Sequence, residues 1–111
     1  MKWISLTDLG QLNDVADTSQ NKTTVIFKHS TRCSVSRMAL KQFENEFSLP
    51  DDAIDAYFLD LLNHRDVSNE ISLRFGIEHQ SPQLLIFQNK SVVYSASHSD
   101  IDASAVANFV L

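Results

Sequence analysis

The sequence predicts a mixed α/β sandwich, with residues 1–111 forming one domain. Short runs of β-branched and aromatic residues alternate with segments of helical periodicity. The last two extended runs are separated only by Asn89 and Lys90, as in a hairpin, and a helical segment follows them. Two glycines and two prolines are few for a turn-rich all-β protein. We therefore expect a mixed sheet with a C-terminal β-hairpin and a terminal helix.

The first half of the chain predicts two strand–helix pairs. Residues 3–6 form a short extended entry, and Asp8 with Gln11 fits a capping box for the first helix. The apolar face of that helix is Leu9, Leu12, Val15 and Ala16. Residues 23–28 are typical of a strand buried on both faces. A second helix follows and ends before Pro50, with an apolar face made of Val35, Met38, Ala39, Phe43 and Phe47.

The second half predicts a strand, a helix, a hairpin and a last helix. Residues 56–61 form the strand, Asn63 is expected to cap the helix, and Gly76 fits a left-handed C-terminal cap. Strands 83–88 and 91–95 pair in an antiparallel hairpin. Ser99 or Asp100 is expected to cap the last helix. The expected apolar positions of the two helices are Val67, Ile71 and Phe75, then Ile101, Ala105 and Phe109.

Composition excludes several functions. The net charge of -5 argues against nucleic acid, whose binders usually carry a basic face. No run approaches the roughly 20 apolar residues of a membrane helix, and the N-terminus lacks a signal-peptide pattern. A lone cysteine allows no internal disulfide and suits a reducing compartment. We expect a cytoplasmic monomer that binds neither nucleic acid nor membrane.

The lone cysteine, Cys33, follows a predicted strand and opens a predicted helix. At such a junction the helix dipole and the free amides of the first turn favour the thiolate. The residues from Thr18 to Phe43 include no carboxylate, although five basic residues fall there. These five are Lys22, Lys28, Arg32, Arg37 and Lys41. They either form a solvated basic face or create a positive field around Cys33.

Ser36 stands three residues after Cys33, where a two-cysteine redox motif carries its second thiol. Its hydroxyl is able to donate a hydrogen bond to a thiolate but is unable to close a disulfide. A mixed disulfide on Cys33 would therefore persist until an outside thiol resolved it. This arrangement predicts exchange through a single thiol. The plainer alternative, that Cys33 is a small buried apolar residue, fits poorly with its polar neighbours.

The other chemical candidates are weaker. His29 is either a base for Cys33 or, more simply, a strand-end histidine bonded locally. Asp60 is either a proton acceptor or a cap for the following turn. The four histidines match no zinc spacing with one cysteine, and we expect no metal and no bound cofactor. A proline that opens a strand, as Pro82 does after Ser81, says little by itself.

Together these residues resemble a known group. The element order, with Cys33 opening the long helix and Ser81-Pro82 opening the hairpin, resembles the thioredoxin fold, a three-layer α/β/α sandwich. The stretch from Phe27 to Ser36 resembles the YtxJ-like monothiol bacilliredoxins, whose motif reads Thr-Cys-Pro-Ile-Ser after a Lys-His-Ser lead. Trp3-Ile4 and the chain length fit that family as well, so the resemblance covers essentially the whole chain.

The resemblance implies a function and a set of site residues. Family members are thought to take bacillithiol from oxidised cytosolic proteins onto their own cysteine, here Cys33, with Ser36 in place of the resolving cysteine. Pro82 would be the cis-proline that faces this cysteine, and Ser81 would pair its backbone with the substrate. The positions expected to bind substrate are Arg32, Ser34, Arg37, Ser81 and Pro82.

The chain departs from the family motif beside the cysteine, where Arg32 replaces threonine and Ser34 replaces proline. The lost proline frees a first-turn amide and the arginine adds a positive charge, so a thiolate is still favoured. Bacillithiol carries malate carboxylates, which Arg32, Arg37 or Lys41 would hold, although glutathione or another anionic thiol would fit as well. The identity of the small thiol co-substrate therefore stays open.

Two other functions are compatible with the residues. One is a thioredoxin-fold module that binds extended peptides without catalysis, with Cys33 incidental. The other is iron–sulfur binding as in monothiol glutaredoxins. Their cysteine is followed by Gly-Phe-Ser, which Ser34-Val35-Ser36 does not match. Thiol exchange on thiol-modified proteins is the favoured prediction.

Overall fold

A five-stranded mixed sheet forms the centre of the protein, seen here in a computed structural model that describes residues 1–110. Its strands are β1 (Trp3–Ser5), β2 (Thr24–His29), β3 (Asp55–Asp60), β4 (Gln83–Gln88) and β5 (Ser91–Ser97). Their order across the sheet is β1-β3-β2-β4-β5. The first three are parallel, while β4 runs antiparallel to β2 and pairs with β5 in a hairpin. The predicted mixed sheet and hairpin are confirmed.

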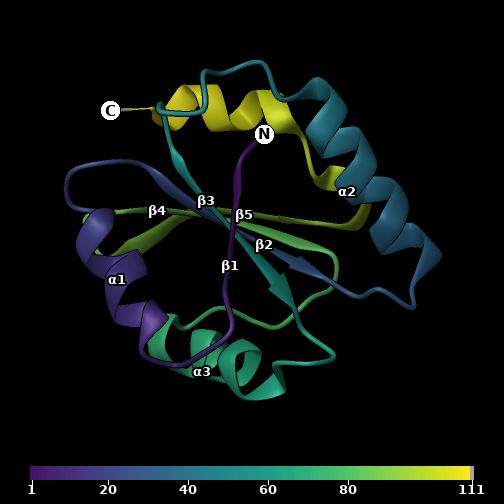
Figure 1. Ribbon diagram of the computed structural model, residues 1–111, viewed down its shortest axis with the longest axis horizontal. Coiled ribbons are helices and arrows are strands. Elements are labelled where there is room, and N and C mark those ends of the chain that lie inside the picture. Colours follow the sequence, from purple (N-terminus) through teal and green to yellow (C-terminus); the bar gives the residue numbers. More distant parts are fainter. Residues whose placement is uncertain (111) are drawn as a thin grey trace.

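Helices cover both faces of this sheet, which gives the predicted three layers (Figure 1). The helices α1 (Gln11–Thr18) and α3 (Arg65–Phe75) pack on one face, where Val15 and Ile71 are fully buried. The helix α2 (Ser34–Glu46) and the 3-10 helix η2 (Ala103–Phe109) pack on the other, where Phe43 and Val106 are buried. A 3-10 turn, η1, spans His98–Asp100. No helix in the described residues is long and apolar enough to cross a membrane.

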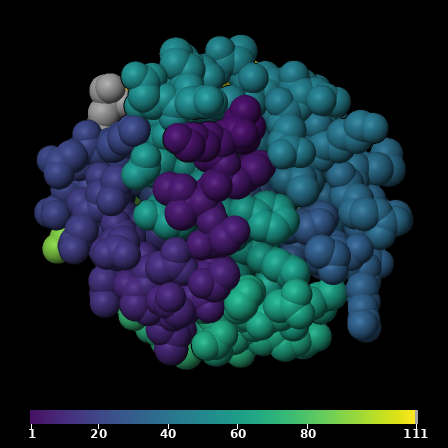
Figure 2. Space-filling view, in the orientation of Figure 1, coloured from purple at the N-terminus to yellow at the C-terminus, as the bar shows by residue number. Residues whose placement is uncertain are grey.

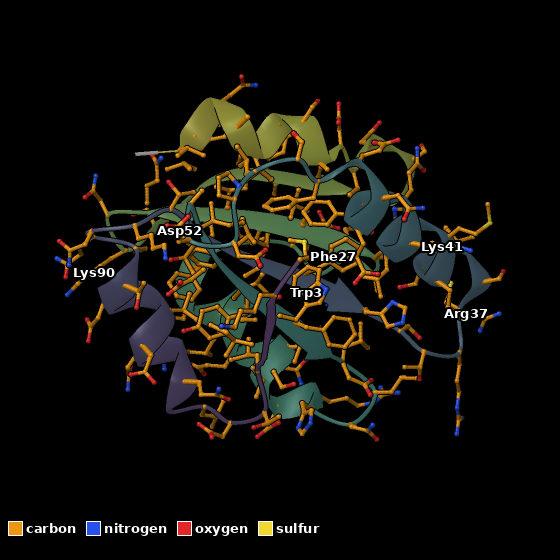
Figure 3. The ribbon with its side chains drawn as sticks, turned by 45° about the horizontal axis from the view of Figure 1, so that its top comes forward. Trp3, Phe27, Arg37, Lys41, Asp52 and Lys90 are labelled. Carbon is orange, nitrogen blue, oxygen red and sulfur yellow. The ribbon has the colours of Figure 1, made fainter. Side chains whose placement is uncertain are left out.

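An aromatic cluster fixes α2 against the sheet. The ring centroid of Phe43 lies 5.4 Å from that of Phe27 on β2, and 6.0 Å from that of Trp3 on β1. Trp3 and Phe27 also meet edge to face, in the middle of the side-chain view (Figure 3). The Trp3 indole N–H donates to Glu44 of α2 at 2.8 Å. Through Trp3 the short edge strand β1, which crosses the visible face in Figure 2, becomes part of the support for α2.

Several local predictions are confirmed by the backbone and its hydrogen bonds. The Gln11 amide N–H donates to Asp8 Oδ1 at 2.9 Å, and the Gln11 side-chain oxygen accepts from the Thr7 amide at 2.7 Å, so a reciprocal cap opens α1. Gly76 ends α3 with a φ of 67°, in the left-handed region. Asn89 and Lys90 both have positive φ in the hairpin turn.

Other local predictions are wrong at helix ends and helix faces. Asn63 does not cap α3, because His64 is the N-cap residue and the Asn63 amide donates to Asp60. The last helix is not capped by Ser99 or Asp100 but begins at Ala103, where Asp102 accepts from the Ser104 amide. Its buried residues are Ala103 and Val106, with Ile101, Ala105 and Phe109 only partly buried. Leu9, Val35 and Met38 are exposed, although their spacing predicted core positions.

The contrast between two apolar residues of α2 gives a direct test of this packing. Phe43→Ala is expected to lower the free energy of unfolding by about 3–5 kcal/mol, because the side chain is 1% exposed within the aromatic cluster. Met38→Ala should change it by no more than about 0.5 kcal/mol, since Met38 is 73% exposed. Urea denaturation of both variants measures the difference. Equal losses would show that the assigned buried face of α2 is wrong.

Candidate functional site

Cys33 lies at the junction between β2 and α2, as the sequence predicted. It is the N-cap residue of α2, with extended backbone angles (φ -105°, ψ 120°). Its amide donates to the Ser30 carbonyl at 3.2 Å, and its carbonyl accepts from the Arg37 amide at 3.0 Å. The thiol is free and partly exposed. Full burial of Cys33, the structural alternative to a reactive role, does not occur.

The start of α2 favours negative charge at this position. The Cys33 side chain makes no capping hydrogen bond, and the first turn of α2 contains no acidic residue. The partial positive charge of the helix N-terminus is therefore not neutralised by a carboxylate of that turn. An anion on the Cys33 sulfur would lie at the favourable end of the helix dipole.

Ser36 is the most constrained side chain of the site. It is fully buried, and its hydroxyl lies 2.7 Å from His29 Nδ1 at the end of β2. The same oxygen accepts a hydrogen bond from the Ser30 amide at 3.0 Å. Because the amide uses the hydroxyl as acceptor, the hydroxyl proton is free to be donated to His29. The expected hydrogen bond from Ser36 to the Cys33 sulfur is not among the contacts of the described residues.

His29 is bonded locally, which favours the simpler of its two predicted roles. Burial lowers the pKa of His29, and the nearby carboxylate of Asp60 opposes that shift. The two residues are register partners on β2 and β3. One Asp60 oxygen accepts from Asn63 at 2.7 Å, whereas the other, Oδ1, is buried without a hydrogen-bond partner. Asp60 therefore acts as an anchor for the turn that follows β3 and as a negative neighbour of His29.

The Ser81-Pro82 peptide bond is cis and lies at the same end of the sheet as Cys33. Lys28 and Gln83 are register partners, so Pro82 directly precedes the β4 segment that pairs with the end of β2. Pro82 is buried, and its carbonyl accepts from the His98 amide at 3.2 Å. The Ser81 hydroxyl oxygen is buried without a hydrogen-bond partner. Sheet register thus brings this loop, as predicted, to the edge where Cys33 lies.

The basic residues of the predicted window separate in space. Arg32 lines a pocket of about 240 Å³ with Thr31, Leu62, Asn63 and Arg65. Arg37 instead donates from its guanidinium to the Thr31 carbonyl at 3.1 Å. Arg37 and Lys41 lie on the outer side of α2, pointing away from the sheet (Figure 3). Of the three cations proposed to hold carboxylates, only Arg32 lines this pocket.

Arg65, which lines the same pocket as Arg32, was not among the residues predicted from the sequence. It opens α3, directly after the turn that follows β3. Since β2 and β3 are parallel neighbours, the loops after their carboxyl ends meet at one edge of the sheet. That rule brings the β3–α3 turn beside the loop of Cys33. It does not indicate which residue of the turn would face the pocket.

Lys28 is the other residue that the sequence analysis misplaced. Its side chain is fully buried on the α3 side of the sheet, where Nζ lies 3.3 Å from Nδ1 of His79. The Ser68 hydroxyl lies at the same distance, 3.3 Å, from that ring nitrogen. Burial lowers the pKa of Lys28 to about 8, and burial together with Lys28 lowers the pKa of His79. Lys28 therefore adds no exposed charge around Cys33.

The described residues contain no group of three or more metal-ligating side chains that is able to hold a metal ion. The arrangement around Cys33 instead combines one accessible sulfur, a helix N-terminus, a buried hydroxyl that fixes the loop, and a cationic pocket. Such a site is suited to nucleophilic attack by sulfur on a disulfide.

The fold and the position of its cysteine define the thioredoxin class of proteins. A solved structure of a candidate oxidoreductase with a thioredoxin fold is 31% identical, with a TM-score of 0.81, and the match covers 96% of this chain and 91% of that one. Thioredoxin from Malassezia sympodialis (Mala s 13) matches at 21% identity and a TM-score of 0.72, over 97% and 86% of the two chains. A mutant thioredoxin from Halobacterium salinarum matches at 16% and 0.70, over 98% and 88%. The predicted thioredoxin-like fold is confirmed.

The sequence also matches a particular family within the proteins that share this fold. Residues 4–106 match the sequence model of the family described as monothiol bacilliredoxin BrxC. The chain belongs to this monothiol bacilliredoxin family, as the Lys28-His29-Ser30 lead and Cys33 predicted. Membership implies thiol–disulfide chemistry of the bacilliredoxin type, and a single cysteine is consistent with one-thiol exchange.

Loss of the Ser36 hydroxyl should weaken the whole loop. Ser36→Ala leaves the Ser30 amide and His29 Nδ1 without their shared partner, and a buried unpaired polar group costs about 1–3 kcal/mol. The free energy of unfolding, measured in urea, is expected to fall by that amount. Ser34→Ala, at an exposed position of the same turn, should change it by no more than about 0.5 kcal/mol. An unchanged stability of Ser36→Ala would contradict the assigned hydrogen bonds.

The buried amine of Lys28 predicts an unusual pH dependence of stability. Because the pKa of Lys28 in the folded protein, about 8, lies below its ordinary value of 10.5, the unfolded chain binds more protons between these two pH values. The free energy of unfolding should therefore rise as the pH increases through this range. Lys28→Met, which lacks this group, should be more stable than the wild type at pH 7, and the gap should narrow by up to about 3 kcal/mol toward pH 10.

Urea denaturation at several pH values measures this gap. Lys41→Met removes an exposed lysine and should keep the wild-type pH dependence. A gap that stays constant from pH 7 to pH 10 for Lys28→Met would show that Lys28 is not a buried, titrating amine.

Proposed function

We propose that this protein removes bacillithiol, or a similar low-molecular-weight thiol, from oxidised cytoplasmic proteins by monothiol exchange at Cys33. The observation that carries the proposal is a partly exposed lone cysteine at the N-cap of α2, in a chain of the monothiol bacilliredoxin family. The favourable end of the helix dipole supports a thiolate there. Iron–sulfur binding is not supported, since Cys33 is followed by Ser34-Val35-Ser36 and not by the Gly-Phe-Ser of monothiol glutaredoxins.

The proposed step exchanges one disulfide for another. The Cys33 thiolate attacks the small thiol's sulfur in the mixed disulfide and forms a new S–S bond with it. The bond to the protein sulfur breaks, and that sulfur leaves as a thiolate, which takes a proton from water. Because Ser36 supplies no second thiol, the new disulfide persists until an outside thiolate attacks the small thiol's sulfur. A disulfide between these two small molecules forms, and Cys33 leaves as a thiolate.

The other predicted site residues have proposed roles around this sulfur. The backbone of Ser81, beside the cis-Pro82, would pair with the extended protein substrate. Val35 and Met38, 51% and 73% exposed on the first turns of α2, would give that substrate an apolar contact. Ser34, exposed in the first turn, would offer its amide and hydroxyl to the disulfide.

Two further residues are proposed to restrain the loop that carries Cys33. Arg37 holds the Thr31 carbonyl and so restrains the loop that carries Cys33. Ser36 restrains the other side of that loop through the Ser30 amide. Ser36 is thus a positioning residue. Because its side chain has no thiol, it also leaves Cys33 without an internal partner that could resolve the mixed disulfide.

Intact mass spectrometry tests this function. Wild-type protein incubated with bacillithiol disulfide or glutathione disulfide should gain one small thiol, and Cys33→Ser should gain none. Excess dithiothreitol should return the wild-type mass. A chain that forms no adduct with either disulfide would contradict the exchange function. Capture of a protein partner that persists unchanged in Cys33→Ser would instead favour the non-catalytic peptide-binding alternative.

A further inference from the structure

His79 fastens the loop between α3 and β4, residues 77–82, to two other elements of the fold. Its ring nitrogen Nδ1 lies 3.3 Å from Nζ of Lys28 on β2, and the hydroxyl oxygen of Ser68 on α3 lies 3.3 Å from the same nitrogen. The loop ends at Pro82, directly before β4. One imidazole ring therefore joins the loop that leads into Pro82 to the central strand and to a helix.

The surroundings of that nitrogen determine which protonation state fits. Lys28 is fully buried, and burial lowers its pKa to about 8, so near neutral pH its amine is mostly an ammonium group. An ammonium group donates hydrogen bonds and accepts none, so Nδ1 of His79 must accept and the neutral ring carries its proton on Nε2. Ser68, which is 3% exposed, is placed to donate to the same nitrogen. The geometry thus describes a neutral histidine between two donors.

A proton on Nδ1 of His79 would remove this acceptor and bring a second positive charge against a buried ammonium group. Burial together with Lys28 lowers the pKa of His79 below its ordinary value of 6.5. The pocket beside the ring, about 180 Å³ in volume, is lined by no carboxylate, and its other residues are Leu61, Arg65, Ser68 and Asn69. Arg65 adds a further positive charge there. Glu78, the neighbour of His79 in the chain, is exposed and lines a different pocket beside β5.

Acid is therefore expected to weaken this contact, and base is not. The pKa of the ring is lower against Lys28 than in water, so the contact weakens as the pH falls below 6.5. Above the pKa of Lys28 the neutral amine still has N–H groups to donate. No carboxylate offsets the second charge, because within residues 1–110 neither His79 nor Lys28 forms an ion pair.

We propose that His79 is a positioning residue for protein substrates: its neutral ring holds the 77–82 loop against β2 and α3, and protonation of the ring releases the loop. This inference rests on the proposed exchange function, in which the backbone of Ser81 pairs with the protein substrate, and it adds the pH range in which that pairing is available. Exchange with a small disulfide needs the Cys33 sulfur and not this loop. Protonation of His79 should therefore slow exchange with a protein substrate more than exchange with a small disulfide.

An NMR titration of the folded protein from about pH 7 to about pH 5 tests the contact without any exchange reaction. The ring of His79 and the backbone amides of Gln80 and Ser81 should change together, with a midpoint below pH 6.5. In Lys28→Met the midpoint of the ring should move to a higher pH, because the charge that opposes its protonation is gone.

Two further variants show whether the titrating group is His79 itself. His79→Asn keeps a short side chain that accepts a hydrogen bond but does not titrate, so the loop amides should keep their neutral-pH shifts at about pH 5. His64→Gln is the matched control: it removes a histidine at the start of α3 whose side chain makes no capping hydrogen bond, and it should leave the loop titration unchanged. Loop amides that shift in His79→Asn as in the wild type, or that stop shifting in His64→Gln, would overturn the role of His79.

The pH dependence of two exchange rates tests the effect on substrates. One probe is an unstructured peptide without histidine or carboxylates, whose cysteine carries 2-mercaptoethanol in a disulfide, and the other is the disulfide of 2-mercaptoethanol itself. In both, the Cys33 thiolate attacks a 2-mercaptoethanol sulfur, an S–S bond to Cys33 forms, and the other sulfur leaves as a thiolate that takes a proton from water. Intact mass follows the same adduct, so the ratio of the two rate constants cancels the thiolate fraction of Cys33.

The ratio of the peptide rate constant to the small-disulfide rate constant should fall by about fivefold or more in the wild type from about pH 7 to about pH 5. In His79→Asn the ratio should stay within about twofold of its value at neutral pH. His79→Ala, which lacks the acceptor, should have the low ratio already near neutral pH. Circular dichroism verifies that each variant is folded.

The outcomes separate this inference from the exchange function. A ratio that stays constant in the wild type would overturn the positioning role, and so would an equal fall in His79→Asn. If neither probe forms an adduct at any pH, the exchange function itself fails, while the NMR titration still shows whether His79 holds the loop. Normal exchange with both probes and no titration of the loop amides removes only the role of His79.

Discussion

The buried hydroxyl of Ser36 joins the end of β2 to the first turn of α2, and the loop that carries Cys33 lies between these two elements. It meets the His29 ring on one side and the Ser30 amide on the other, so one oxygen serves two partners at the point where the chain changes direction. A buried amide without an acceptor would be costly, which makes this contact a condition for the observed course of residues 30–33. The position of the cysteine relative to the helix dipole depends on that course.

The rest of the fold supports these two partners. His29 is the last residue of β2, the central strand of the sheet, which is flanked by β3 and β4. The α2 helix is held by the aromatic cluster of Trp3, Phe27 and Phe43, in which β1 and β2 both take part. The same sheet register brings the cis-Pro82 loop and the turn after β3 to the edge where Cys33 lies. The partly exposed thiol of Cys33, the cis-Pro82 loop and a cationic pocket thus lie at one edge of the sheet.

The sequence predicted most of this arrangement, since the order of the elements along the chain and the position of the thiol follow from strong local signals. Apolar runs such as 23–28 and the left-handed cap at Gly76 admit few alternatives. The wrong predictions concern which side chains are buried, because local spacing does not determine how a helix is oriented against the sheet. Val35 and Met38 have core spacing, but the helix rotates so that Ala39, Leu40 and Phe43 face the sheet. Lys28 belongs to the basic window, but it also lies in a strand predicted to be buried on both faces, and the structure confirms its burial.

Ser36 also explains why a single thiol is compatible with this frame. At a position where two-cysteine proteins carry a second thiol, the hydroxyl is both a good acceptor for the Ser30 amide and a good donor to His29. A thiol in its place would be weak in both roles and larger, within a site that is fully buried. The residue that deprives Cys33 of an internal partner is therefore the one that stabilises its loop. A single substitution, Ser36→Cys, would therefore change both the number of thiols at the site and the hydrogen bonds that hold the loop of Cys33.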